Sequence, residues 1–356
     1  MKKTESRNDL ERNVVANLPF VDYTIDHSKL LEGAQFIISQ IKPYWPKEQT
    51  KFKQFHGGMT NKLMLCYLDG TEEKALVRVY GHKTEYLIDR EQEMVNICSL
   101  KKNNIGPEVF GRFQNGYCYG YLQGEPLDVE MMRDAHISRL TARKLASWHQ
   151  THIPGDTTPM LFNTLEKWMS IIPESFEDNP TKDKKYKEKF SLPQIRQELQ
   201  QLRTVLEGLN SPIVFSHNDL LCKNVLFHAE SDAVHFIDYE YANYSYRGFD
   251  IGNHFCEFAG MDDPVDYGRY PGRAFQMVWL RQYIAGAQGI TDAEVTEQQV
   301  EAMYREVNKF ALAAHFYWGS WALVQARFSD IDFDYLDYAL LRFAEYFRRK
   351  DEFLAL

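Results

Sequence analysis

Two polar residues in one short segment have the types and the spacing that catalysis requires. Residues 217–224 read HNDLLCKN and place Asp219 five positions before Asn224. Apolar stretches at 213–215 and 225–227 flank the segment, which predicts a loop held between two strands. A carboxylate can accept a proton and an amide oxygen can bind a metal ion, so a catalytic loop is one interpretation. An ordinary polar turn is the alternative, because Asn and Asp are common in turns.

A second carboxylate follows the next apolar strand. Asp238 in HFIDYEY has the position of a second metal ligand, and the spacing from Asp219 to Asn224 is that of a kinase catalytic loop. Phosphoryl transfer needs this set, because an Asp accepts the hydroxyl proton while Asn and Asp hold magnesium against anionic phosphates. Glu240 offers a further hard oxygen for magnesium, and a solvent-facing strand end is its alternative interpretation.

The first third of the chain contains candidate phosphate-binding residues. The segment FHGGMTNKLMLCYL predicts two strands joined by a glycine turn whose amides can approach phosphates. The residues that we assign to this nucleotide contact are Gly57, Gly58, Met59, Thr60 and Asn61. On a third strand, ALVRVYG, Arg78 stands where a protein kinase has Lys, and its guanidinium suits phosphate oxygens. Glu93 on the following helix is the expected partner of Arg78, with Glu91 as its rival.

A hairpin and a hinge complete this part of the chain. The segment PEVFGRFQNGYCYGYL predicts two strands with Asn115-Gly116 as their turn. The hinge residues, whose backbone can meet an adenine edge, are Tyr119, Tyr121 and Leu122.

The order of these elements predicts the fold class. We expect an α+β, bilobal fold of the protein-kinase type. Residues 1–122 form an N-terminal helical extension and a small antiparallel sheet with one helix, and residues 123–356 form a large, mostly helical lobe with the catalytic loop. Residues 173–196 are charged and lightly apolar, which predicts an exposed, mobile insertion.

Composition narrows the possible partners. The net charge of -9 argues against nucleic acid, and five scattered cysteines without a CxxC pair indicate free thiols in the cytoplasm. The first residues lack the apolar region of a secretory signal, and no apolar run reaches about 18 residues, so we expect no stable membrane insertion. The segment FALAAHFYWGSWALV, from Phe310, predicts a buried helix.

Three longer segments resemble the choline/ethanolamine kinase family. They read HNDLLCKNVLF, VHFIDYEYANYSYRGFDIGNHFCEFAG and AAHFYWGSWALVQARFSDIDFDYLDYALLRFAEYF, and the resemblance extends from about Phe52 to Phe347. It implies a kinase that uses ATP and Mg²⁺ on a small amino alcohol, with Asp219 as the base and Asn224 and Asp238 as magnesium ligands. It also implies that Asp250, in GFDIGNH, braces the catalytic loop.

The resemblance further implies a pocket for the ammonium end of the alcohol. The residues matching it are Tyr241, Glu257, Trp318, Trp321, Phe333 and Tyr338. Trp318 and Trp321 are three apart and share a helix face. Aromatic faces with a carboxylate suit a quaternary ammonium, whereas a primary ammonium needs oxygen acceptors for its N–H groups. Ordinary core packing is the alternative for these aromatic residues.

The substrate prediction favours ethanolamine. EFAG, YCYGYLQGEPLD and TEYLIDRE resemble ethanolamine kinases, whereas YSYRGFDIGNHFCE resembles choline kinases. We predict phosphorylation of the ethanolamine hydroxyl, with choline as a second substrate, as the first step of phosphatidylethanolamine and phosphatidylcholine head-group synthesis. The alternatives are a choline kinase proper, an aminoglycoside-type phosphotransferase and a non-catalytic binding protein. The resemblance leaves a homodimer open.

Overall fold

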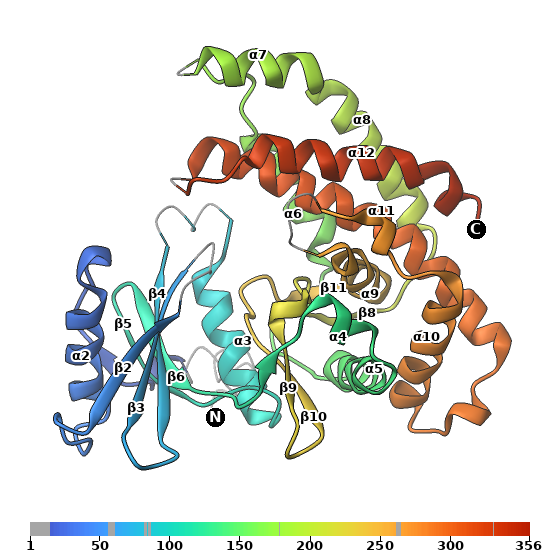
Figure 1. Cartoon of the computed structure of the whole chain (residues 1–356). Coiled ribbons are helices and arrows are strands. Elements are labelled where there is room, and N and C mark those ends of the chain that lie inside the picture. Colours follow the sequence, from blue (N-terminus) through green and yellow to red (C-terminus); the bar gives the residue numbers. More distant parts are fainter. Residues whose placement is uncertain are drawn as a thin grey trace, which may run out of the picture. The chain divides into compact units, whose positions relative to one another are not determined.

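The computed structural model describes residues 15–55, 61–81, 84, 87–177, 179–260, 265–329 and 331–356. The chain divides into two compact units. Unit 1 comprises Met1–Gln123 and Ile153–Gly155, and unit 2 comprises Gly124–His152 and Asp156–Leu356. Figure 1 shows strands and a few helices in unit 1, and mainly helices in unit 2. The predicted α+β class is confirmed, and each unit is described by itself below.

Unit 1 is built on a six-stranded sheet. Its elements are β1 (Phe20–Val21), α2 (Leu30–Ile41), β2 (Thr50–Phe55), β3 (Asn61–Leu68), β4 (Lys74–Tyr80), α3 (Arg90–Lys102), β5 (Val109–Phe113) and β6 (Gly116–Gly120). The strand order is β1-β5-β6-β4-β3-β2, and every pairing is antiparallel except that of β1 with β5.

Strand β4 presents alternate residues to two different helices. Ala75, Val77 and Val79 are buried in one apolar cluster with residues of α2. Arg78 points the other way, because successive side chains of a strand alternate in direction, and it pairs with Glu93 of α3. Figure 1 shows α2 and α3 on opposite sides of the strands.

The turn of the β5–β6 hairpin differs from the prediction by one residue. Phe113 pairs with Gly116, so the turn residues are Gln114 and Asn115, and Gly116 belongs to β6. A Cβ atom on Gly116 would lie 2.0 Å from the carbonyl oxygen of Arg78. Close backbone approach to β4, rather than turn geometry, therefore explains this glycine.

Unit 2 is mainly helical. Its helices are α4 (Val129–Arg133), α5 (Ala135–His149), α6 (Met160–Ile171), α7 (Pro180–Lys189), α8 (Leu192–Glu207), α9 (Arg247–Cys256), α10 (Arg273–Gln288), α11 (Glu297–Phe328) and α12 (Tyr335–Leu354). Its strands are β7 (Glu125–Pro126), β8 (Ile213–Ser216), β9 (Val225–His228), β10 (Ala233–Phe236) and β11 (Asn243–Tyr246), which form the small sheets β10-β9-β7 and β11-β8.

The buried helix predicted from Phe310 is confirmed as part of α11. From Phe310 to Ala326 every residue of α11 is buried. Gly252 of α9 packs against it so closely that a Cβ atom would lie 2.8 Å from the backbone of Val307 and Ala311. Close packing of α9 on α11 therefore requires glycine at this position.

Residues 173–196 are largely exposed, as predicted, but they contain helices that the sequence did not predict. The segment contains α7 and the start of α8. Asn179 caps α7 by accepting from the backbone N–H of Lys182, and the buried Tyr186 anchors the helix by donating to the Pro173 carbonyl. One buried aromatic residue on an otherwise charged helix is too weak a pattern for sequence reasoning to detect.

Two further expectations can be compared with the structure. All five cysteines are free of disulfides, as the sequence predicted, and all five are buried. Within the part of the chain that the structure describes, no helix is both long and apolar enough to cross a membrane.

Candidate active site

Strand pairing brings the predicted catalytic loop next to Asp238. Residues 217–224 lie between β8 and β9, as the sequence predicted. Val225 pairs with Phe236 in the β9–β10 hairpin, and Ile237 N–H donates to the Asn224 carbonyl at 3.0 Å. This extension of the ladder places Asn224 beside the residue that precedes Asp238.

The Asn224 side chain orients Asp219. Its Nδ2 donates to the backbone oxygen of Asp219 at 2.8 Å and to the Oδ2 atom at 3.1 Å. Because Nδ2 makes both contacts, the Oδ1 atom of Asn224 remains available as a ligand for a cation. The five-residue spacing therefore produces a direct contact between the expected base and the expected metal ligand.

Three side chains on one face of α9 hold the main chain of the loop. Asp250 accepts from the backbone N–H groups of His217 and Asn218 at 2.8 and 2.7 Å, which is the bracing that the sequence predicted. Asn253 donates to the Asn218 carbonyl at 3.0 Å, and His254 donates to the Leu220 carbonyl at 2.8 Å. These three residues are three and four positions apart, so they share one helix face.

Asp250 is itself held by a buried histidine. His149 of α5 donates from Nε2 to Asp250 Oδ2 at 2.9 Å, and its Nδ1 lies 2.6 Å from the Tyr283 hydroxyl. Burial alone would raise the pKa of the Asp250 carboxyl, but the His149 hydrogen bond and the loop N–H groups lower it below its ordinary value. Asp250 therefore remains a charged acceptor for the loop.

Asn218 in the predicted catalytic loop and Asp238 after β10 have left-handed backbone conformations. Asn218 has φ of 64° and Asp238 has φ of 66°. Such values are uncommon for residues other than glycine, and they persist where the surrounding contacts enforce them. At Asn218 the backbone N–H donates to Asp250 and the backbone carbonyl accepts from Asn253, and these two hydrogen bonds hold the conformation.

Burial and three nearby carboxylates of unit 2 change the pKa of Asp219. Burial raises the pKa of the Asp219 carboxyl well above its ordinary value, and the negative charges of Asp238, Glu257 and Glu240 raise it further. The four carboxylates therefore form one region of negative potential, which attracts cations.

The donor set fits a magnesium ion that also binds phosphates. Asn224 Oδ1 and the carboxylates of Asp238 and Glu240 are hard oxygen ligands, and Mg²⁺ usually takes one or two protein carboxylates together with substrate phosphates. Among the described residues, no three His, Cys, Asp or Glu side chains form a group that could hold a metal ion by themselves. The arrangement thus suits a metal delivered with a nucleotide rather than a cage of protein ligands.

The aromatic residues predicted for the substrate pocket form a connected cluster. Trp318 and Trp321 lie 5.6 Å apart on α11, and the Tyr241 ring contacts Trp318 at 5.3 Å. Trp321 donates from Nε1 to the Tyr241 hydroxyl at 2.8 Å, and Trp318 donates to Asn253 Oδ1 at 2.7 Å. Asn253 therefore links the predicted catalytic loop directly to the aromatic cluster.

The remaining predicted pocket residues contact an arginine. Arg342 of α12 forms an ion pair with Glu257 at 2.6 Å and donates from Nε to the Tyr338 hydroxyl at 3.0 Å. Phe333 is 45% exposed and contacts the Tyr338 ring at 5.9 Å. Its exposure separates Phe333 from the buried core and suits a residue that a substrate would cover.

In unit 1, the predicted partner of Arg78 is confirmed as Glu93. The two side chains are buried and approach to 3.7 Å. The same carboxylate accepts from Arg90 at 2.7 Å and from the Tyr117 hydroxyl at 2.9 Å. Glu91, the rival, is exposed on α3.

The structure describes the predicted hinge but only the last residue of the predicted glycine turn. Gly57, Gly58, Met59 and Thr60 lie outside the described residues, and Asn61 begins β3 with its Oδ1 accepting from Arg90 at 3.2 Å. Tyr119 packs against the ring of Tyr117, on the same face of the sheet as Arg78 and Glu93.

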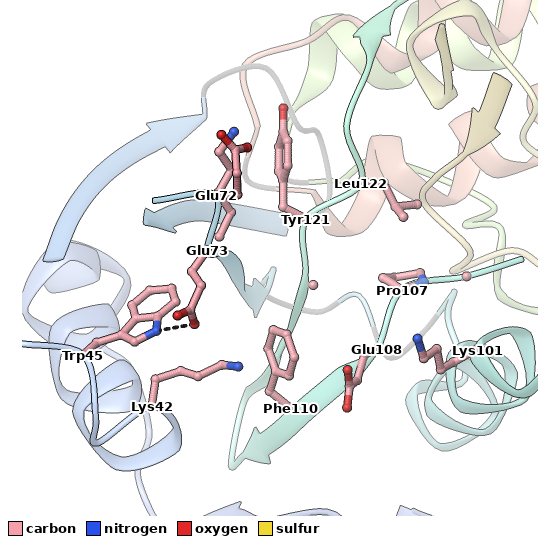
Figure 2. A pocket seen from close by; sticks show the side chains of 13 residues that line it. Lys42, Trp45, Glu72, Glu73, Lys101, Pro107, Glu108, Phe110, Tyr121 and Leu122 are labelled. Atoms are coloured by element: carbon pink, nitrogen blue, oxygen red, sulfur yellow. Dashed lines mark hydrogen bonds between the residues drawn. The ribbon is translucent and has the colours of Figure 1, made fainter. Parts of the chain in front are cut away.

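A cavity of about 370 Å³ lies beside Tyr121 and Leu122, within unit 1 (Figure 2). Trp45, Lys42 and Phe110 line it, and Trp45 donates to Glu73 at 2.8 Å. Trp45 and Phe110 belong to the apolar cluster of α2 or pack on it, and Lys101 of α3 also lines the cavity.

Comparisons with known proteins decide the family. The model of the choline/ethanolamine kinase family matches residues 52–347. The chain belongs to this family. It is 41% identical to mouse ethanolamine kinase 1 over 348 residues, covering 95% of each chain, and 41% identical to mouse ethanolamine kinase 2 over 346 residues, covering 96% of this chain and 87% of the relative. The solved structure of a Plasmodium vivax ethanolamine kinase, 24% identical, has a TM-score of 0.80 and covers 97% of this chain and 95% of its own.

The fold of this choline/ethanolamine kinase family member is thus the predicted one. Sequence reasoning missed several residues that hold the site, namely His149, His217, Asn253, His254, Arg90 and Arg342. For Asn253 and His254 a signal existed, because their spacing from Asp250 already placed them on one helix face. Arg342 carried no such signal, since a lone Arg on an amphipathic helix is usually exposed.

Proposed function

We propose that the protein transfers the γ-phosphoryl group of ATP to the hydroxyl of ethanolamine, with choline as a second substrate. Membership of the family makes it a kinase, an enzyme that phosphorylates an alcohol and binds a nucleotide. One observation carries the proposal: Asn224 holds Asp219 in a loop that Asn253 joins to the aromatic cluster at Trp318. A proton acceptor and a cation-binding surface are thus coupled through one side chain. The product would enter phospholipid head-group synthesis.

Asp219 is the proposed base. Its carboxylate accepts the proton of the substrate hydroxyl as that oxygen attacks the γ-phosphorus, and the hydrogen bond from Asn224 keeps it in one orientation. Asn224, Asp238 and Glu240 are the proposed residues for Mg²⁺, which when bound neutralises phosphate charge.

Unit 1 is the proposed nucleotide lobe. Glu93 orients the Arg78 guanidinium, which we propose contacts the phosphates of ATP. We keep the glycine turn from Gly57 to Thr60 with Asn61 as a further phosphate contact, and Tyr119, Tyr121 and Leu122 as the adenine contact. Residues 1–122 and 123–356 remain our proposed functional division of the chain.

The proposed ammonium pocket lies in unit 2. Its aromatic faces come from Tyr241, Trp318, Trp321, Phe333 and Tyr338, and its carboxylate comes from Glu257. Faces of Trp and Tyr attract a cation through their negative quadrupole. The mouse relatives are named ethanolamine kinases, which supports ethanolamine over choline.

The pocket fits an aminoglycoside substrate less well than ethanolamine. An aminoglycoside carries several cations spread over a large molecule, whereas the tryptophan faces beside Glu257 suit a single small ammonium group. A cytoplasmic location is proposed from the free, buried cysteines. Nucleic acid is not a proposed partner because of the net charge of -9, and a homodimer remains an open prediction.

A substrate panel tests the proposed reaction. Purified protein with saturating ATP and Mg²⁺ should release ADP with ethanolamine, more slowly with choline, and at background rate with an aminoglycoside. Chelation of Mg²⁺ should abolish the release. Equal kcat/KM for ethanolamine and choline would contradict the substrate preference, and release only with the aminoglycoside would contradict the proposed function.

Substitution of Asp219 tests the base. Asp219→Asn should lower kcat about 10³-fold, because the amide cannot accept the proton. Burial and the neighbouring carboxylates raise the pKa of the folded Asp219 carboxyl, so the stability from this group is complete below its unfolded pKa and is lost as pH rises through the folded pKa.

Asp219→Asn should therefore raise Tm at pH 7 in a buffer with EDTA and no nucleotide. A variant with unchanged kcat would contradict the role of Asp219, and the Tm shows independently that the protein is folded.

A further inference from the structure

Arg342 contacts two residues of the proposed ammonium pocket. Only 2% of the residue is exposed. Its Nη2 atom donates to Glu257 Oε1 at 2.6 Å, and its Nε atom donates to the Tyr338 hydroxyl at 3.0 Å. One buried guanidinium therefore fixes both the carboxylate and one aromatic residue of the pocket.

Because the guanidinium of Arg342 is planar, its two hydrogen bonds fix the positions of Glu257 and Tyr338 relative to each other. Tyr338 and Arg342 are four residues apart on α12, whereas Glu257 directly follows α9. The Nε and Nη2 donors have a fixed mutual geometry, so Glu257 and Tyr338 are held relative to each other. A lysine in this position would keep the charge but would lose that geometry.

The ion pair leaves one oxygen of Glu257 for a ligand. Oε1 is bonded to Arg342, and Oε2 has no hydrogen bond to any residue in the described ranges. The Glu257 side chain is 11% exposed, so it is accessible although largely buried. The pocket thus presents an oriented acceptor whose negative charge is offset by an adjacent cation.

We propose that Arg342 is a positioning residue that determines which ammonium this pocket selects. It orients Glu257 so that Oε2 accepts an N–H from a primary ammonium, and it offsets the Glu257 charge. This inference rests on the proposed function, in which ethanolamine is the preferred substrate.

The two alcohols respond differently to such a carboxylate. A primary ammonium has three N–H donors and gains from a fixed acceptor. A quaternary ammonium has none, and it gains from aromatic faces and from uncompensated negative charge. An oriented but neutralised carboxylate therefore favours ethanolamine, and release of Glu257 from Arg342 favours choline.

The test measures kcat/KM for ethanolamine and for choline in Arg342→Gln. The ratio of ethanolamine to choline should fall about tenfold relative to wild type, mainly through opposite changes in the two KM values. Arg342→Lys retains the charge but not the fork, and its ratio should lie between those of Arg342→Gln and wild type. The Lys variant also provides the measurement if the Gln variant does not fold.

Arg247→Gln is the matched control. Like Arg342, Arg247 makes two side-chain hydrogen bonds, but both go to the Glu306 carboxylate, and neither residue belongs to the proposed pocket. Its substitution should change Tm and leave the ratio at the wild-type value.

A folded Arg342 variant in which both kcat/KM values fall by the same factor overturns the inference, because Arg342 would then only join two helices. Wild-type protein that turns over neither alcohol overturns both the proposed function and this inference. Turnover with an unchanged ratio in both Arg342 variants overturns this inference alone.

Discussion

In unit 1 one carboxylate, Glu93, accepts hydrogen bonds or ion pairs from three side chains, whereas in unit 2 three side chains of α9 bind main-chain atoms of the predicted catalytic loop, residues 217–224. The Glu93 contacts come from Arg78, Arg90 and Tyr117. The loop contacts run from Asp250, Asn253 and His254 to backbone atoms of residues 217, 218 and 220.

This difference predicts how substitutions in the two units affect stability and catalysis. In unit 1 the contacts between side chains orient one functional group, and the backbone of β4 is held separately by its hydrogen bonds to β3 and β6. Contacts from side chains to a loop backbone replace the missing ladder, because a buried N–H or C=O without a partner is costly. Stability and catalysis should therefore be coupled in unit 2 and largely separable in unit 1.

Asp250→Ala should have the largest effect and tests whether stability and catalysis are coupled in unit 2. The substitution removes the acceptor of two buried N–H groups and leaves His149 without its carboxylate. We expect the free energy of unfolding to fall by about 3–5 kcal/mol and kcat to fall with it. Urea denaturation and steady-state kinetics measure the two effects.

Asp134→Ala is the control for Asp250. Asp134 also accepts from two backbone N–H groups, those of His136 and Ile137, but it is an exposed helix cap. Its loss should cost about 1 kcal/mol and leave kcat unchanged. Equal costs for the two variants would show that burial of the loop contacts is unimportant.

A pH series on His254→Gln tests the same loop. Burial lowers the pKa of His254 to about 4, below its ordinary value of 6.5. Stability from the neutral imidazole is therefore complete above pH 6.5 and is lost as pH falls through the folded pKa. Between pH 7 and pH 5 the wild type should lose about 2 kcal/mol more than the Gln variant, which cannot be protonated.

Exposed His152 provides the comparison for this series. His152→Gln should follow the wild-type curve of unfolding free energy against pH. If His254→Gln also follows the wild-type curve, protonation of His254 does not contribute to acid unfolding of unit 2.

The smallest expected effect is that of Glu93→Gln in unit 1. Weaker orientation of Arg78 should raise KM for ATP about tenfold, with little change in KM for ethanolamine. Glu91→Gln, on the exposed face of α3, should leave both values unchanged. A large fall in kcat without a change in KM for ATP would mean that Glu93 does not act on nucleotide binding.

Local patterns explain which parts of the site could be predicted. Asp219 and Asn224 contact each other because they lie five residues apart in one loop, and alternation on β4 placed Arg78 on the α3 face. The pairing of Arg78 with Glu93 rather than Glu91 needed the structure, since both glutamates lie in the first turn of α3.

Longer-range contacts could not be predicted from such patterns. The charged segment 173–196 is helical because the buried Tyr186 anchors α7, and Arg342 is buried because Glu257, 85 residues earlier in the chain, accepts its hydrogen bond. Hydropathy assigns charged residues to the surface unless a partner of opposite charge is known.

The amino-acid order alone was enough to predict the α+β class, the catalytic loop and the candidate metal ligands, because those features depend on residue type and on short spacing. The tertiary structure decided that α9 holds the loop backbone, that Asn253 joins it to Trp318, and that Arg342 forms an ion pair with Glu257. Each of these is a contact between buried polar groups far apart in the chain, and only folding determines which partner such a group meets.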